Sequence, residues 1–173
     1  MRHALTKYNL QNRLAGREDV PLCDQGFQEI ETNRALIMSA VSKADTVLCS
    51  TLLRCRQTCE ALGIEKRTIF SEGLIEKDFG TATGKKRQEV ARDKNGNVIE
   101  ANVEAFDMIE RRAVAVIKQF VKNGSVFVVS HGGVFTALNQ TCTKPLSGKT
   151  KNAIPYRFVN YGTSQSHCVL FHS

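Results

Sequence analysis

The 173-residue chain lacks the features that would place it in a specialised class of protein. It has no tryptophan and only 3 prolines beside 12 glycines, and 42% of its residues are hydrophobic, which excludes a collagen-like or disordered chain. No apolar run approaches the roughly 20 residues of a membrane span, and the start of the chain has no basic-then-apolar leader. We therefore expect a soluble cytoplasmic protein with no membrane partner, folded as a single domain over residues 1–173.

The cysteines contain no C-x-x-C pair, which argues against a zinc site and against a thioredoxin-like redox centre. A chain of this length can build a core without disulfides, so we expect reduced and mostly buried thiols. The six residues are Cys23, Cys49, Cys55, Cys59, Cys142 and Cys168.

The charge is unbalanced, with 24 basic residues against 17 acidic ones and a net charge of +7. Such a surplus favours anionic partners, but charge alone does not choose among nucleic acid, acidic membranes and phosphorylated small molecules. The basic residues are spread along the chain with few aromatics between them, so we do not expect nucleic-acid binding.

Strand-like and helix-like segments alternate along the chain. Short apolar runs predict strands, and apolar residues three and four apart, clearest over 102–122, predict helices. Strands are expected at 46–49, 68–70, 126–129 and 168–171, and helices at 24–41 with Asp24 as the cap, at 52–62, at 102–122, and after 131–133 to about 141. This order predicts an α/β sandwich with a mostly parallel sheet.

Reactive residues stand directly after the expected strands, where parallel sheets place their ligand sites. His131, followed by two glycines, comes after the third strand, Arg54 follows the first, and Glu76 lies in the loop after the second. Arg2 and His3 stand at the start of the chain. Two histidines, two arginines and one carboxylate at one sheet edge would form a phosphate pocket with a nucleophile and a proton donor.

Five segments in order then resemble the motifs of the histidine phosphatase superfamily. They are 2–9 (RHALTKYN), 12–22 (NRLAGREDVPL), 50–58 (STLLRCRQT), 74–84 (LIEKDFGTATG) and 129–133 (VSHGG). The resemblance implies a three-layer α/β/α fold like that of phosphoglycerate mutase. It also implies a metal-independent phosphatase without a cofactor, which hydrolyses phosphomonoesters through a phosphohistidine intermediate.

The resemblance also implies the roles of the site residues. His3 would attack phosphorus, Glu76 would protonate the leaving oxygen, and His131 would complete the catalytic set. The implied phosphate-binding residues are Arg2, Asn9, Arg54, His131 and Gly132. The substrate would be a phosphorylated small molecule or a phosphoprotein, and neither its identity nor the oligomeric state is predicted.

The chain departs from the family at its start, where only Met1 precedes Arg2. One residue cannot form the strand that leads into the Arg-His pair in the family. Either the natural protein starts further upstream, or the first strand is absent, the sheet has a gap where His3 must be held, and the neighbouring strands expose unpaired edges that invite strand exchange. Ala4 replaces the usual glycine, which is tolerated if its backbone avoids left-handed space.

The 55 positions from Glu76 to His131 leave no room for the long insertion of the mutases, so we expect a phosphatase with a small cap-like segment at about 77–104. Two alternatives stay open: a protein phosphohistidine phosphatase, and a weakly active domain that binds phosphate because the first strand is missing. His167 and His172 lie outside the motifs and are interpreted as ordinary strand residues. The basic run 85–87 is either a solvated face or a contact for a second anionic group.

Overall fold

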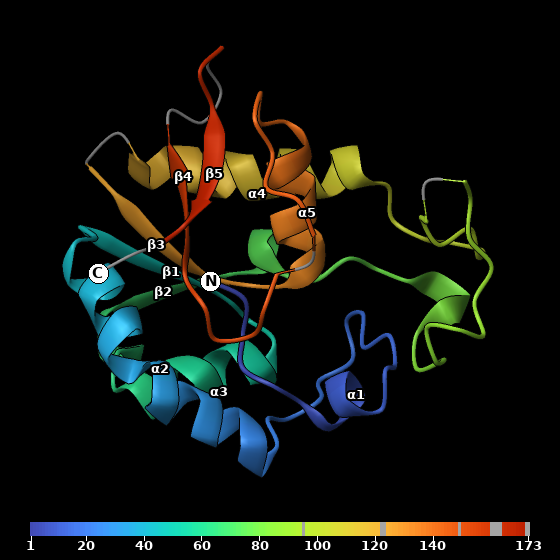
Figure 1. The fold of residues 1–173 in the computed structure, drawn as a ribbon, viewed down its shortest axis with the longest axis horizontal. Helices are drawn as coiled ribbons and strands as arrows, with labels where there is room; N and C mark the ends of the chain where they lie inside the picture. The colour runs from blue at the N-terminus through green and yellow to red at the C-terminus, as the bar shows by residue number, and fades with distance from the viewer. Residues whose placement is uncertain (95, 122–123, 149, 160–163, 172–173) are drawn as a thin grey trace.

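The computed structural model describes residues 1–94, 96–121, 124–148, 150–159 and 164–171. Its central sheet lies between two helical layers, with α2 and α3 on one face and α4 and α5 on the other (Figure 1). The helices are α1 (Lys7–Leu10), α2 (Asp24–Ser42), α3 (Leu53–Leu62), α4 (Phe106–Val121) and α5 (Gly132–Gln140), with 3-10 turns at Glu65–Arg67, Glu72–Leu74 and Gly80–Ala82. The predicted three-layer α/β/α fold is confirmed.

The central sheet has the strand order β2-β1-β3, and both pairings are parallel. Its strands are β1 (Thr46–Ser50), β2 (Thr68–Ser71) and β3 (Val126–Val129). They coincide with the three strands expected at these positions to within one residue. Because all three run the same way, the segments that follow them meet at one edge of the sheet.

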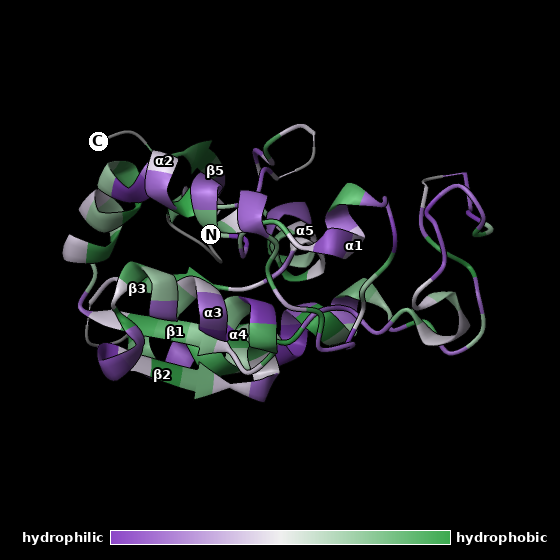
Figure 2. Cartoon of the chain, turned by 90° about the horizontal axis from the view of Figure 1, so that it is seen from below, coloured by the Kyte–Doolittle hydropathy of each residue, from purple (hydrophilic) through white to green (hydrophobic). Residues whose placement is uncertain are grey.

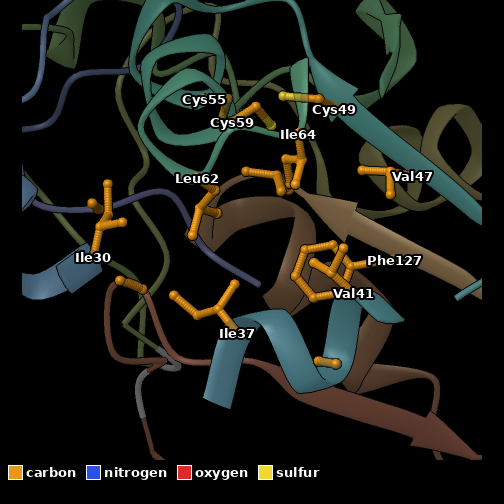
Figure 3. Close-up of a cluster of buried hydrophobic side chains, with 14 of the residues drawn as sticks. Ile30, Ile37, Val41, Val47, Cys49, Cys55, Cys59, Leu62, Ile64 and Phe127 are labelled. Atoms are coloured by element: carbon orange, nitrogen blue, oxygen red, sulfur yellow. The ribbon is translucent and has the colours of Figure 1, made fainter. Parts of the chain in front are cut away.

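Two core clusters fill the space between the sheet and the helical layers. Alternate residues of β1 and β3, such as Val47 and Phe127, pack against α2 and α3, whereas Leu48 packs against α4 and α5. Figure 3 shows the first cluster, including Cys49, Cys55 and Cys59. In Figure 2 the β1 ribbon between the helices is largely green, the colour of hydrophobic residues. All six cysteines are buried and free, as expected.

A second, two-stranded sheet contains β4 (Tyr156–Val159) and β5 (His167–Leu170), which pair antiparallel. The sequence predicts β5 with bounds shifted by one residue. It does not predict β4, nor that β4 and β5 form a sheet separate from the parallel one. The ring of Phe135 on α5 packs at 5.1 Å from Tyr156 and 5.3 Å from Phe158, so aromatic contacts hold β4 against the helical layer. His172 lies outside the described residues.

No strand precedes β1 in the described part of the chain. β3 pairs with β1 on one side only and β4 belongs to a separate sheet, but His3 itself is held in place. Arg2 forms isolated parallel bridges with both Ser130 and Asn152, and the His3 N–H donates to the Ser130 carbonyl at 2.9 Å. Residues 1–3 therefore connect the end of β3 to the segment that leads into β4.

The start of α4 differs from the prediction. The helix begins at Phe106 rather than at Asn102, which adopts a positive φ of 61°. Glu104 is instead paired with Asp78, since each backbone N–H donates to an oxygen of the other residue, at 2.9 and 3.1 Å. The predicted end at Lys122 lies outside the described residues. At α2 the cap position is held by Cys23, and Asp24 is the first helical residue rather than the cap.

The segment 77–104 has a small apolar cluster of its own, formed by Ala82, Val90 and Val98 with Leu14 from the N-terminal loop. In Figure 1 this segment projects from one side of the sandwich. Within the described residues, no helix combines the length and the apolar character needed to cross a bilayer.

Candidate active site

Side chains from three distant motifs meet at the carboxyl edge of the parallel sheet. His3, Arg54 and His131 are each no more than 2% exposed, and the rings of His3 and His131 have their centroids 5.2 Å apart. Arg54 comes from the first turn of α3 and His131 from the turn between β3 and α5. The structure thus brings these three residues together, as the motif order predicts.

The ring of His3 is held in one orientation by two hydrogen bonds. Nδ1 lies 2.7 Å from the carbonyl of Ala4, so this nitrogen carries the proton, and the lone pair is on Nε2. Arg54 Nε donates to that lone pair at 3.2 Å. Burial, and then the positive charges of Arg54 and Arg2, hold the pKa of His3 well below its usual value. The imidazole is therefore neutral, as a nucleophile must be.

The main chain around His3 is anchored by side chains that the sequence did not single out. Asn152 donates its amide to the His3 carbonyl at 2.7 Å, and the Thr58 hydroxyl accepts from the Ala4 N–H at 3.2 Å. Ala4 is fully buried and has no positive φ, which explains why the usual glycine is dispensable here. Both bonds fix the peptide group that joins His3 to Ala4.

Arg54 also fixes the loop of the second motif. Its Nη1 donates to the carbonyl of Glu18 at 2.7 Å and its Nη2 to that of Gly16 at 2.8 Å, where Gly16 adopts a positive φ of 51°. A single guanidinium therefore connects this loop to the ring of His3. The planar fork of arginine allows this arrangement, which the single ammonium of lysine cannot reproduce.

His131 makes two buried contacts in addition to His3. Its Nε2 lies 2.7 Å from the Ser50 hydroxyl at the end of β1 and 3.5 Å from the Cys55 thiol. Burial is the main cause that holds its pKa well below the usual range, and the positive charge of Arg54 comes next. Cys55, interpreted from the sequence as a packing residue, thus also borders the site.

Arg2 lies in the same site with a hydrogen-bond donor that has no partner among the described residues. Its Nη1 makes a long bond of 3.4 Å to the Thr150 carbonyl, whereas its buried Nε has no partner among the described residues. Gly132 lies against this guanidinium, since a Cβ built on that glycine would be 3.7 Å from Arg2 Nε. An unpaired cationic donor beside the N-terminus of α5 is suited to an anion.

Glu76 is fixed by main-chain donors. Its Oε1 accepts from the N–H of Lys77 at 2.8 Å and from that of Gly133 at 2.9 Å. A Cβ on Gly133 would lie only 2.3 Å from that oxygen, so a side chain here would displace the Glu76 carboxylate. Gly133 lies two residues after His131, which places the Glu76 carboxylate at the edge where the histidines meet.

Arg112, which the sequence analysis did not identify, holds the loop of Glu76 from behind. From α4 it donates to the carbonyls of Gly73 at 3.0 Å, Ile75 at 2.7 Å and Glu76 at 3.2 Å. Its Nε binds the Glu104 carboxylate at 2.9 Å. The loop that carries the candidate proton donor is therefore fixed by charge-assisted bonds.

Asn9, the predicted neutral phosphate ligand, has a second role in the fold. Its Oδ1 accepts from the Thr6 N–H at 3.1 Å and completes the capping box of α1. Its amide nitrogen donates to no described residue, and Asn152 approaches the oxygen at 3.5 Å. Asn9 thus lies beside the anchor of His3 with a free N–H group.

The basic run 85–87 divides into two parts. Lys85 and Lys86 are exposed and pair with Glu100 and Glu89. Arg87 is half-buried, and burial is the main cause that lowers its pKa, while the charge of Glu76 opposes the shift. No group of three or more metal-ligating side chains exists among residues that the structure describes.

Comparisons with known proteins agree with this geometry. A family model described as "Histidine phosphatase superfamily (branch 1)" matches residues 1–157. The uncharacterized phosphatase PhoE of Bacillus subtilis is 25% identical over 143 residues, which cover 80% of this chain and 72% of the relative. A 2,3-bisphosphoglycerate-dependent phosphoglycerate mutase of Rhizobium etli is 27% identical over 161 residues, covering 81% and 77%.

Solved structures show the same fold at lower identity. A mycobacterial glucosyl-3-phosphoglycerate phosphatase superposes with a TM-score of 0.73 at 19% identity, covering 98% of this chain and 94% of that one. A phosphoglycerate mutase from Thermus thermophilus superposes with a TM-score of 0.71 at 22% identity, covering 88% and 86%.

Proposed function

The chain belongs to the histidine phosphatase superfamily, and from this premise we propose that it hydrolyses phosphate monoesters through a phosphohistidine formed on His3. The observation that carries the proposal is the state of the His3 ring. Its Nδ1 is tied to a carbonyl, its Nε2 lone pair faces the Arg54 guanidinium, and its pKa is lowered well below the usual value. A neutral imidazole aimed at a cationic donor is suited to attack a bound phosphoryl group.

The first step transfers the phosphoryl group from the substrate to the enzyme. His3 Nε2 attacks phosphorus, the bond from phosphorus to the ester oxygen breaks, and the departing oxygen takes a proton from Glu76. In the second step Glu76 takes a proton from water, the resulting hydroxide attacks phosphorus, and the nitrogen–phosphorus bond breaks. Inorganic phosphate leaves, and both His3 and Glu76 return to their starting states.

The charge on the transferring group is balanced by donors already in place. Arg2 offers its unpaired Nε, Arg54 its Nε, and the N-terminus of α5 the N–H of Gly132. Asn9 adds its free amide, and His131 completes the ring of donors. Phosphoryl transfer requires mainly positioning and charge stabilisation, which fixed cationic donors supply.

A phosphorylated small molecule fits the region around Glu76 better than a phosphoprotein does. The segment 77–104 would act as a small cap, since it has its own apolar cluster and borders the loop of Glu76. We propose that half-buried Arg87 contacts a second anionic group of the substrate. The predicted cytoplasmic location and the absence of a nucleic-acid partner stay predictions.

The test is hydrolysis of p-nitrophenyl phosphate by the chain and by two histidine variants, with a chelator present throughout. His3→Ala should abolish turnover, whereas His167→Ala, on β5 and outside the site, should keep it. Acid-sensitive phosphate trapped on His3 in quenched reactions would identify the intermediate. Turnover by His3→Ala at the rate of the parent chain would overturn the proposal, and phosphate binding without turnover would favour the binding domain instead.

Two arginines on α3 allow the effect of a charge inside the site to be distinguished from the effect of the protein's net charge. Arg54 is buried at His3, and Arg56, two residues on, is exposed over the Phe70 ring. Arg54→Lys should weaken competitive inhibition by inorganic phosphate, because the single ammonium of lysine cannot donate from several nitrogens in the planar geometry of a guanidinium. Arg56→Lys should leave the inhibition constant unchanged, and equal losses would contradict the assigned role of Arg54.

A further inference from the structure

Ser50 is the last residue of β1, at the carboxyl edge of the parallel sheet, and it is fully buried. Its Oγ accepts from the Leu52 N–H at 3.3 Å, which closes a short turn after the strand. The same oxygen lies 2.7 Å from Nε2 of His131, closer than the Cys55 sulfur at 3.5 Å. The steps described above give Ser50 no role, although it contacts one of the proposed phosphate ligands.

The hydroxyl proton of Ser50 decides which ring nitrogen of His131 is protonated. A serine hydroxyl has one proton to donate, and the Ser50 oxygen already accepts from the Leu52 N–H. Among the described residues, Nε2 of His131 is the acceptor that this proton can reach. If Nε2 carried the ring proton instead, the Ser50 proton would be buried without an acceptor, which folded proteins rarely allow. The hydroxyl therefore donates, and Nε2 holds a lone pair.

The thiol of Cys55 does not change this assignment. Its Sγ lies 3.5 Å from Nε2 and 3.9 Å from Nδ1 of His131, and the thiol donates to the Ser130 carbonyl at 3.5 Å. Sulfur is a weak hydrogen-bond partner, and the hydroxyl is closer. Burial and then the positive charge of Arg54 lower the pKa of His131 well below its usual value, so the ring has a single proton. That proton lies on Nδ1.

Nδ1 is therefore the ring donor that His131 can offer to a ligand. Apart from the Cys55 sulfur at 3.9 Å, this nitrogen has no partner within the described part of the chain. His131 is the N-cap of α5, and its side chain makes no capping bond, so the helix does not use Nδ1 either. Because Nδ1 is the ring nitrogen nearer to the main chain, its N–H and that of Gly132 can address the same anion.

We propose that Ser50 is a positioning residue: its hydroxyl donates to Nε2 of His131 and keeps the ring proton on Nδ1, from which His131 donates to an oxygen of the transferring phosphoryl group. The donor role rests on the proposed function, whereas the position of the proton does not. His3 and His131 then carry their protons on the same nitrogen for opposite purposes. His3 is tied at Nδ1 and offers a lone pair, and His131 is tied at Nε2 and offers a proton.

The chain contains a matched control for Ser50. Ser71 ends β2 and is the register partner of Ser50 in the parallel sheet. Its hydroxyl accepts from the Gly73 N–H at 3.3 Å, the same two-residue turn that Ser50 makes with Leu52. None of the described histidines forms a hydrogen bond with Ser71. Ser71→Ala therefore removes a turn bond alone, whereas Ser50→Ala removes a turn bond together with the contact to His131.

The position of the proton is read by NMR on the full chain, with isotope-labelled histidine nitrogens and no substrate. The chain has four histidines, and the signals that disappear in His131→Asn identify those of His131. In the parent chain and in Ser71→Ala we expect a protonated Nδ1 and an unprotonated Nε2. In Ser50→Ala the proton should move to Nε2, and Ser50→Thr, which keeps the hydroxyl, should restore the parent pattern.

The donor role is read from kcat for p-nitrophenyl phosphate and from the Kd of inorganic phosphate. Loss of one fixed donor to a developing negative charge lowers kcat by about 10²–10³, so Ser50→Ala should lose on the order of a hundredfold. Ser71→Ala should keep the parent rate, and Ser50→Thr should recover most of it. Circular dichroism shows whether Ser50→Ala folds. If it does not, Ser50→Cys takes its place, because a thiol keeps the size and is a much weaker donor.

Three results would overturn the proposal. The first is a parent spectrum with the proton on Nε2 of His131. The second is a proton that moves in Cys55→Ala but not in Ser50→Ala, since the thiol would then hold the ring. The third is a moved proton with unchanged kcat and unchanged Kd of phosphate, which refutes the donor role. A parent chain without turnover contradicts the proposed function instead, and the spectra and the Kd of phosphate then still decide among these outcomes.

Discussion

Replacing Gly133 by alanine should displace Glu76, the proposed proton donor, while the fold is kept. The new methyl group would lie 2.3 Å from Glu76 Oε1 and 2.9 Å from the Lys77 Cβ, where ordinary contacts begin at 3.4 Å. The carboxylate must therefore retreat by about 1 Å and lose its bond to the Gly133 N–H. Gly132→Ala is the matched control, because its methyl group would meet Arg2 Nε at an ordinary 3.7 Å and the backbone N–H is retained.

The stability of the Gly133 variant should change little. Alanine favours a helix over glycine by about 1 kcal/mol, and α5 contains this residue in its first turn. Loss of a hydrogen bond to a charged group costs about 1.5–3 kcal/mol. The net loss in the free energy of unfolding is then about 0.5–2 kcal/mol, too small to unfold a domain of ordinary stability.

The rate should change far more than the stability. A displacement of about 1 Å costs on the order of a hundredfold, within the range of about 10²–10⁴ that a general acid supplies. The loss should be about a hundredfold in kcat for an alkyl phosphate, whose leaving oxygen needs a proton, and much smaller for p-nitrophenyl phosphate. Equal rates for Gly133→Ala and Gly132→Ala on the alkyl ester would refute the placement of Glu76 as the acid.

Three further outcomes can be measured. Thr58→Val should lower the free energy of unfolding by about 1–3 kcal/mol in urea, since it leaves the buried Ala4 N–H without an acceptor, and Thr58→Ser should restore most of it. Arg112→Lys should lower kcat with little change in KM, because the loop that carries Glu76, the proposed proton donor, loses hydrogen bonds to its main-chain carbonyls. The lowered pKa values of His3 and His131 keep both rings neutral in the folded protein, so below about pH 6.5 the unfolded state binds more protons than the folded state. The free energy of unfolding should therefore fall as the pH drops through that value, by up to about 1.4 kcal/mol per pH unit for each ring. His3→Asn should flatten that slope, and an unchanged slope would contradict the burial of a neutral ring.

The sequence predicts the parallel sheet well because its strands carry their own signal. The run at 126–129 is apolar throughout and β3 has those bounds, and the residues after each strand meet as the carboxyl-edge rule requires. The start of α4 was predicted four residues too early, at Asn102. There the periodic pattern continues, but the tie between Glu104 and Asp78 keeps the chain extended. Local periodicity contains no information about a partner 26 residues away.

The supports of the site escaped prediction for a different reason. Arg112 binds main-chain carbonyls 36 to 39 residues away. Every residue has such a carbonyl, so the side-chain sequence does not indicate which ones an arginine will bind. Gly133 was noted only as one of the two glycines after His131, although its lack of a Cβ leaves room for the Glu76 carboxylate. By contrast, β4 had a usable signal, since in Tyr156–Val159 the charged Arg157 lies between two aromatic residues, before a further strand.

Side chains from three separate segments hold His3 and Ala4 in place. The main chain next to His3 also forms isolated bridges, from Arg2 to Ser130 and to Asn152. Asn152, Thr58 and Arg54 each reach His3 or Ala4 from a different part of the chain, and each is itself held by the fold. These side-chain hydrogen bonds set the position of His3, the proposed nucleophile. A variant that removes any one of them should lower the rate before it lowers the amount of folded protein.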